Sequence, residues 1–241
     1  MTTERIDIAV PQNALDDLSD RIARTRWPDQ ISGSGWDYGT DTAYLKGLLS
    51  YWRDGFNWRK REERINRFEH FRTMIDGLQI HFIHAKSRSG RAIHLLLLHG
   101  WPSSFLQMLD ILPMLTNPPS GDGPDFEVIV PSLPGFGSSP APDTRGLNER
   151  TCASIFVHLM HDVLGFVRFA ARGSDIGASI LQHLARDPPQ RLLGLHLTGI
   201  CPIVGDIPVD ATARELEFVN EARIVNGGVK TCHGAAQKSA S

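Results

Sequence analysis

The chain has 241 residues, of which 41% are apolar and 22% charged, and its formal net charge is −2. These values fit a globular protein with one large domain, or one domain and an appendage, and they argue against a nucleic-acid partner. The longest apolar run, residues 93–98, is interrupted by His94 and is too short to cross a bilayer. The start of the chain also lacks the pattern of a signal peptide. We therefore expect a cytoplasmic protein without a membrane anchor.

The N-terminal third is predicted to be helical. Apolar residues recur at helical spacing over residues 13–23 and 40–52. Residues 58–68 are strongly charged, but glutamates alternate with the basic residues, which favours a solvated helix face with local ion pairs over a basic binding patch.

From Ile75 the periodicity changes to that of strands alternating with helices. Strands are expected near residues 78–84 and at 93–98, 126–130, 166–172 and 192–197. Helices are expected at 104–115, 147–164, 178–186 and 210–224. Such alternation predicts an α/β fold with a mostly parallel sheet that is covered by helices on both faces. The polar residues after Asn226 lack apolar periodicity and are predicted to be disordered.

The most informative motif is Gly173-Ser174-Asp175-Ile176-Gly177, between a predicted strand and a predicted helix. This is the context of a nucleophile elbow, a sharp turn that exposes its central side chain at the top of a sheet. A carboxylate in that place can displace a leaving group from an sp3 carbon and form an ester with it. Asp175 is therefore a candidate nucleophile for epoxide or alkyl-halide substrates, although an aspartate here could also simply cap the following helix.

A second motif, His99-Gly100-Trp101-Pro102, follows the apolar strand directly. Gly100 permits an unusual backbone conformation, and the bond from Trp101 to Pro102 is a candidate cis peptide. In α/β-hydrolases a backbone N–H from this loop and the N–H after the nucleophile form an oxyanion hole, which predicts donors at Trp101 and Ile176. His99 is expected to brace the loop.

The three cysteines, Cys152, Cys201 and Cys232, are odd in number, and no two have the spacing of metal ligands. We expect reduced thiols, at least two of them buried. Cys232 lies beside His233, but two ligands in a polar tail are a weak indication of a metal. We expect neither a metal nor another cofactor.

Several further stretches, taken in order with these two motifs, resemble the microsomal-type epoxide hydrolases, including their N-terminal domain. These stretches are Arg24–Asp29, Gly35–Gly39, Tyr51-Trp52, Asn57–Arg59, Ile75–Phe82 and Pro131–Gly137. The resemblance implies an α/β-hydrolase that converts a small-molecule epoxide to a vicinal diol without a cofactor, in detoxification or aromatic hydrocarbon catabolism. It implies an N-terminal segment over 1–74, a hydrolase core over 75–208, the start of a lid over 209–225 and a tail over 226–241. Trp27, Trp36, Trp52 and Trp58 would bury surface against the core and lid.

The resemblance also implies a mechanism in two steps. Asp175 would open the epoxide to form an ester, and two lid tyrosines would donate hydrogen bonds to the epoxide oxygen. A histidine held by an acidic residue would then activate the water that releases the diol.

The chain departs from the family after the elbow. Its tyrosines, Tyr38, Tyr44 and Tyr51, all precede Asp175, and none of His183, His196 and His233 stands where the base is expected. The base, its acid partner, the last strands and most of the lid are therefore predicted to be absent, through truncation or a shifted reading frame. We expect a weak or inactive enzyme, and an open sheet edge that favours self-association.

Two other functions are compatible with the sequence. A haloalkane dehalogenase-like hydrolase uses the same aspartate elbow, although the N-terminal motifs argue against it. A non-catalytic binding protein, or pseudoenzyme, would fit the missing base and tyrosines.

Overall fold

The computed structural model describes residues 2–87, 89–119, 123–186, 189–199 and 211–217. The chain divides into two units, residues 1–197 and 198–241. In the second unit, residues 213–217 are helical, and the side chain of Glu215 accepts a hydrogen bond from the Thr212 N–H. The predicted helix at 210–224 is confirmed only there, and the predicted tail at 226–241 lies outside the described residues. The predicted segment boundaries stay predictions.

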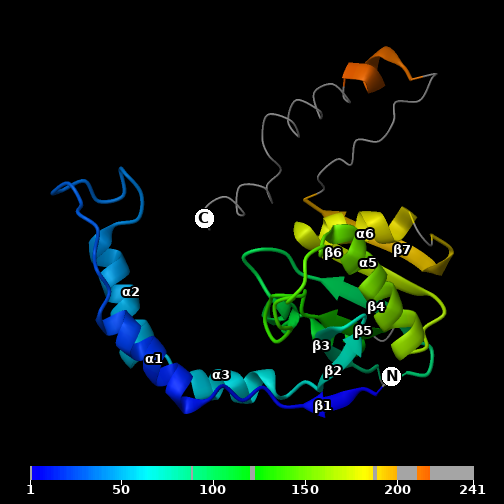
Figure 1. Cartoon of the computed structure of the whole chain (residues 1–241), viewed down its shortest axis with the longest axis horizontal. Coiled ribbons are helices and arrows are strands. Elements are labelled where there is room, and N and C mark those ends of the chain that lie inside the picture. Colours follow the sequence, from blue (N-terminus) through cyan, green and yellow to red (C-terminus); the bar gives the residue numbers. More distant parts are fainter. Residues whose placement is uncertain (1, 88, 120–122, 187–188, 200–210, 218–241) are drawn as a thin grey trace. The chain divides into compact units, whose positions relative to one another are not determined.

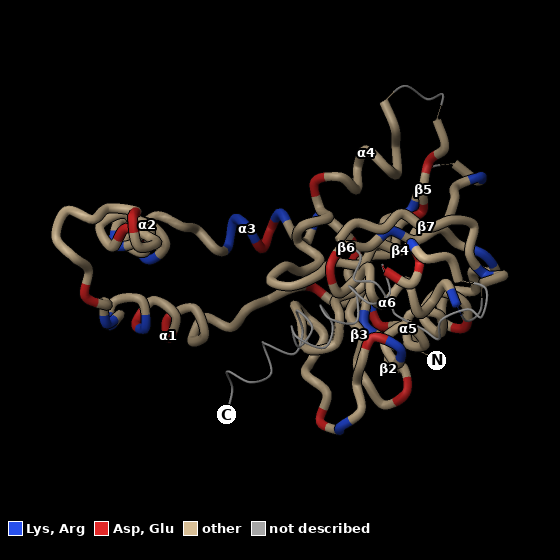
Figure 2. The backbone as a smooth tube through the Cα atoms, turned by 90° about the horizontal axis from the view of Figure 1, so that it is seen from above, with Lys and Arg blue, Asp and Glu red and all other residues tan. Residues whose placement is uncertain are grey.

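Three helices form the N-terminal part, as predicted: α1 (Gln12–Ala23), α2 (Thr42–Asp54) and α3 (Trp58–Ile65). Side chains cap two of them, because Asp41 accepts from the Ala43 N–H and Asn57 from the Lys60 N–H. Figure 2 shows basic and acidic residues interspersed along α1 and α3. The third helix ends three residues before the predicted Phe68.

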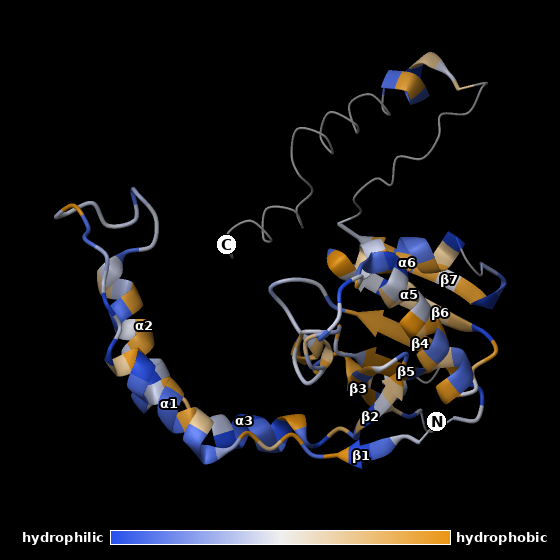
Figure 3. Ribbon diagram, in the orientation of Figure 1, coloured by the Kyte–Doolittle hydropathy of each residue, from blue (hydrophilic) through white to orange (hydrophobic). Residues whose placement is uncertain are grey.

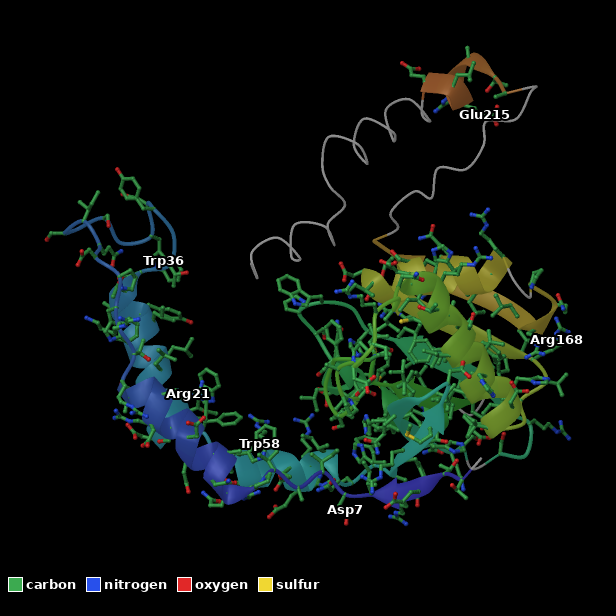
Figure 4. All side chains as sticks on the ribbon, in the orientation of Figure 1. Asp7, Arg21, Trp36, Trp58, Arg168 and Glu215 are labelled. Atoms are coloured by element: carbon green, nitrogen blue, oxygen red, sulfur yellow. The ribbon has the colours of Figure 1, made fainter. Side chains whose placement is uncertain are left out.

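The expected burial of the N-terminal tryptophans is wrong for two of the four. Trp36 and Trp52 are 58% and 44% exposed. Trp27 is half-buried, and so is Trp58, which lies at the start of α3 (Figure 4). Trp58 packs against the apolar cluster that contains Ile65.

Seven strands form one sheet in the order β1-β2-β3-β5-β4-β6-β7 (Figure 1). The strands are β1 (Glu4–Ile6), β2 (His70–Ile75), β3 (Leu78–Ala85), β4 (Ile93–Leu98), β5 (Phe126–Pro131), β6 (Phe169–Ser174) and β7 (Leu192–Thr198). Strand β4 is parallel to β5 and β6, but the pairs β1–β2, β2–β3 and β3–β5 are antiparallel. The α/β class is confirmed, and the sheet is mixed where a mostly parallel one was predicted.

The strands β1 and β2 contradict the prediction of an all-helical N-terminal third. Strand β1 has only three residues and pairs Glu4 with Arg72, far away in the sequence. In β2, exposed and half-buried residues interrupt the alternation that identifies a strand. Strand β2 forms a hairpin with β3 through Asp76 and Gly77, which both have positive φ, so the Asp-Gly pair was a sequence signal for this strand.

The apolar run in β4 is buried on both sides of the sheet. Leu96 and Leu98 lie in the cluster that packs under α5 (Glu149–His158) and α6 (Ile176–Arg186), whereas Leu95 and Leu97 lie in the cluster on the other face. Successive side chains of a strand point to opposite faces, so a strand covered on both sides is apolar throughout. Figure 3 shows this concentration of apolar residues in the central strands.

The helix predicted at 104–115 is wrong in its continuity. Residues Phe105–Met108 form the 3-10 helix η1, and α4 covers only Leu112–Thr116. Pro113 lies in the first turn of α4, where its missing N–H is tolerated, but it cannot continue a preceding helix. The helix predicted at 147–164 is α5 followed by a π-helical turn, η2 (Leu159–Val163), and a further 3-10 turn, η3, covers Pro189–Arg191.

Strand β7 is the last in the order of the described sheet, and Leu193 and Leu195 on it are 50% and 36% exposed. Self-association through this edge stays a prediction. Among the described residues, no helix combines the length and apolarity needed to cross a membrane.

Hydrogen bonds connect the segment after β1, which contains Val10, to Glu62 in helix α3. The Glu62 carboxylate, only 8% exposed, accepts from the Val10 N–H at 2.7 Å, from the Trp58 indole at 3.0 Å and from Arg59 at 2.8 Å. These donors, the Val10 N–H above all, lower the pKa of Glu62.

We expect Glu62→Gln to lower the free energy of unfolding by about 1–2 kcal/mol at pH 7, because it removes the charge from these hydrogen bonds. A carboxyl whose pKa is depressed by folding stabilises the protein above its usual value of 4.5, and this contribution is lost as the pH falls through the lowered value. Urea unfolding should therefore show a difference from wild type that shrinks below pH 4.5. Glu63→Gln, an exposed neighbour, is the control, and an equal effect of both changes would contradict this role.

Candidate active site

Asp175 occupies the turn between β6 and α6 with a backbone φ of +55°. This left-handed conformation is uncommon for residues other than glycine, and it persists only where the surrounding structure enforces it. The residue is exposed at the carboxyl end of β6, and its carbonyl oxygen accepts the Ser179 N–H at 3.1 Å as helix α6 begins. The carboxylate is therefore presented outward from the end of the sheet, as the elbow predicts.

Two glycines allow the turn to lie against the end of β4. A Cβ atom on Gly177 would lie 2.7 Å from the carbonyl oxygens of Leu98 and His99, and one on Gly173 would lie 2.7 Å from the backbone of Gly177. Real Cβ contacts are longer than this, so side chains at these positions would force the turn away from β4. The register pairs Leu98 with Gly173, which sets the two strand ends side by side.

The predicted loop after β4 meets Asp175 directly. The Trp101 N–H donates a hydrogen bond of 2.9 Å to the Asp175 Oδ1, and a Cβ on Gly100 would lie 2.6 Å from both the Cβ and the Oδ1 of Asp175. The bond from Trp101 to Pro102 is cis, as predicted. The indole of Trp101 is 64% exposed, so the contact with Asp175 is made by its backbone.

The other predicted donor, Ile176, is the first residue of α6 and is half-buried. The first N–H groups of a helix have no acceptor within the helix, and the positive end of the helix dipole lies there. An anion beside Asp175 is thus favoured at this end of α6. The role of Ile176 as a donor stays a prediction.

His99 has the geometry expected of a brace. It is fully buried, its Nδ1 lies 3.0 Å from the Gly100 carbonyl oxygen, and its Nε2 lies 3.1 Å from the Leu133 nitrogen. Because a carbonyl only accepts and an N–H only donates, Nδ1 carries the proton and Nε2 accepts. Burial lowers the pKa of His99, which keeps the ring neutral.

The histidines that follow Asp175 lie on other elements. His183 is within α6, His196 is exposed on β7, and His233 is outside the described residues. Of the cysteines, Cys152 is a buried free thiol whose pKa burial raises to about 12, while Cys201 and Cys232 are not among the described residues. In the part of the chain that is described, no three His, Cys, Asp or Glu side chains are grouped to hold a metal ion.

The sequence patterns did not indicate a series of buried polar side chains that ends at the turn at 132–139. Ser132, His81 and His70 are buried and hydrogen-bonded in series beneath the turn at 132–139. No short motif joins them, because they come from three different strand regions. The available indication was the polar side chains within otherwise apolar strand patterns.

Comparison with known proteins agrees with this architecture. Residues 3–108 match the family described as epoxide hydrolase N terminus, and residues 93–234 match the α/β-hydrolase fold. The chain is 44% identical over 190 residues to epoxide hydrolase 1 of Oryctolagus cuniculus, an alignment that covers 76% of this chain and 42% of that protein.

Two solved structures are similar to the chain. Juvenile hormone epoxide hydrolase of Bombyx mori has a TM-score of 0.76 and 32% identity, over 82% of this chain and 53% of that one. Aspergillus niger epoxide hydrolase has a TM-score of 0.73 and 28% identity, over 93% of this chain and 60% of that one. The chain spans about half the length of these relatives. It belongs to the α/β-hydrolases and, among them, to the epoxide hydrolase family that carries this N-terminal region.

Proposed function

We propose that this chain carries the nucleophilic half of an epoxide hydrolase, with Asp175 as the nucleophile. The observation that carries the proposal is the hydrogen bond from the Trp101 N–H to the Asp175 Oδ1. It occupies one carboxylate oxygen and leaves Oδ2 to attack. The names of the relatives favour an epoxide as the substrate.

In the first step, Oδ2 attacks an epoxide carbon, the bond from that carbon to the epoxide oxygen breaks, and the resulting alkoxide takes a proton from a donor in the medium. The product is a hydroxyalkyl ester of Asp175, whose carbonyl oxygen is Oδ1. The Trp101 N–H already bonds this atom in the resting protein.

In the second step, water loses a proton to a base and adds to the ester carbonyl, so that Oδ1 becomes an oxyanion. The N–H groups of Trp101 and Ile176 would stabilise this charge, which a prepositioned donor does without reorganisation. Collapse of the intermediate breaks the bond from Cγ to Oδ2. Oδ2 leaves as part of the vicinal diol and takes up the proton that the base had removed from water, and the oxygen of the water completes the restored carboxylate. Among the described residues that follow Asp175, we assign neither His183 on α6 nor His196 on β7 as the base, and we propose that this chain accumulates the ester.

Incubation with styrene oxide should raise the intact mass of the protein by the mass of one epoxide molecule, and little diol should form. Peptide mapping should place the ester on Asp175, and Asp175→Ala should abolish it. If folded wild-type protein yields neither adduct nor diol, the nucleophile proposal is wrong and the non-catalytic binding function is favoured. Halide release from an alkyl halide at a higher rate would instead favour the dehalogenase function.

The close approach of Gly100 to Asp175 predicts a second result. A methyl group at Gly100 would displace the carboxylate and the Trp101 N–H by about 1 Å, a misplacement that can reduce a rate by about 100-fold. Gly100→Ala should therefore slow formation of the adduct by about that factor while the thermal transition stays cooperative.

The control for this variant is Gly47→Ala on α2, where a Cβ meets no atom within 4 Å. It should leave the rate of adduct formation unchanged. Equal rates for Gly100→Ala and wild type would show that the contact between Gly100 and Asp175 does not position the nucleophile.

A further inference from the structure

A chain of buried hydrogen bonds ends at Ser132, the first residue of the turn at 132–139, and the next residue of this turn contacts His99. His70 Nε2 lies 3.0 Å from the Ile65 carbonyl oxygen, His70 Nδ1 lies 2.9 Å from His81 Nε2, and His81 Nδ1 lies 2.8 Å from the Ser132 Oγ. The three side chains are at most 1% exposed. The chain thus connects the end of α3, through β2 and β3, to the residue that follows β5.

The positions of the protons in this chain follow from its ends. The Ile65 carbonyl can only accept, so His70 carries its proton on Nε2. Burial lowers the pKa of His70, and lowers that of His81 to about 3, so both rings are neutral at neutral pH. His70 Nδ1 then accepts from His81 Nε2–H, and His81 Nδ1 accepts from the Ser132 hydroxyl. One arrangement satisfies every group.

Ser132 beside His81 has the spacing of a nucleophile and its base, but a second hydrolytic site does not fit here. Ser132 is fully buried, and a Cβ on Gly137 would lie only 2.8 Å from its Oγ and 3.2 Å from the ring of Phe105. A substrate has no room to reach the hydroxyl. The chain of hydrogen bonds therefore acts on the protein itself.

The turn at 132–139 is held on two sides. On one side, the Ser132 N–H donates to the His81 carbonyl at 2.9 Å, and the Ser139 hydroxyl accepts from the His81 N–H at 3.0 Å. On the other side, the Leu133 N–H donates to His99, and the edge of Phe136 meets the His99 ring at 5.5 Å between centroids. His99 in turn donates to the carbonyl of Gly100, the residue before Trp101.

We propose that Ser132 is a positioning residue for the Trp101 N–H. Its hydroxyl, hydrogen-bonded to His81, fixes the turn at 132–139, and this turn fixes the ring of His99. His99 then fixes the Gly100 carbonyl. Because this carbonyl and the Trp101 N–H belong to the same peptide group, the N–H that bonds Asp175 is fixed as well. The consequence for catalysis rests on the proposed function of Asp175, whereas the structural coupling does not.

The test is Ser132→Ala, which leaves the His81 Nδ1 without its donor. In protein labelled with 15N-tryptophan, the backbone amide resonance of Trp101, assigned with Trp101→Phe, should shift. The limiting rate of adduct formation with styrene oxide should fall about 10-fold for a displacement below 1 Å, with the half-saturating concentration unchanged. The rate is expressed per folded protein, so that a loss of stability alone would leave it unchanged.

The matched control is Thr73→Ala, which also removes a buried hydroxyl. Thr73 lies on β2, and its hydroxyl donates to the Thr2 carbonyl. It should leave the Trp101 resonance and the adduct rate as in wild type. An unchanged Trp101 resonance in folded Ser132→Ala overturns the proposal, as does an unchanged adduct rate. If wild type forms no adduct, the proposed function fails, and the Trp101 resonance still decides whether Ser132 positions the loop.

A measurement on the wild-type protein covers the case in which Ser132→Ala does not fold. Long-range 1H–15N spectra of the histidine rings should show His70 and His81 protonated on Nε2 and His99 on Nδ1. The ring of His81, whose pKa burial lowers to about 3, should not titrate between pH 5 and 8. A different tautomer at His81, or titration of its ring in this range, overturns the proposal.

Discussion

The candidate site depends on the close approach of two backbone segments at the carboxyl ends of β4 and β6. Gly100 and Gly177 have no side chains, so the loop after β4 lies against the elbow and the Trp101 N–H reaches the Asp175 Oδ1 at 2.9 Å. The left-handed conformation of Asp175 turns its carboxylate outward. A change in either segment moves donor and acceptor together, because there is no free space between them.

Several polar side chains near this contact are buried and hydrogen-bonded, among them His81, His99 and Ser132. The apolar clusters on the two faces of the sheet include residues of the loops at the strand ends, such as Leu133 in the turn at 132–139 and Phe105 after β4. Buried histidines and serines add hydrogen bonds to this packing, and hydrogen bonds have a direction that apolar packing lacks. His81 and His99 are neutral and each has one protonation pattern, so they hold the turn at 132–139 from opposite sides.

The sequence was most informative where the structure is local. The elbow, the loop after β4 and the cis bond at Trp101-Pro102 depend on short motifs, and the structure has the geometry that they predict. Strand β1 was missed because its pairing with β2 joins residues far apart in the sequence. Strand β2 was missed although it forms a hairpin with β3 through Asp76 and Gly77, a turn signal that the sequence contains. The prediction of one continuous helix at 104–115 was wrong because Pro113 cannot continue a preceding helix. The hydrogen bond between His81 and Ser132 joins residues 51 positions apart, and no short motif indicates it.

The two carboxylate oxygens of Asp175 have different roles in the proposed mechanism. There, Oδ1 would stay with the Trp101 N–H, which it bonds in this structure, and Oδ2 would form the bond to carbon. A crystal structure of the protein after reaction with styrene oxide tests this directly. We expect the ester oxygen to be Oδ2 and the carbonyl oxygen to remain within hydrogen-bond distance of the Trp101 nitrogen. An ester on another residue, or a carbonyl turned away from Trp101, would contradict the account.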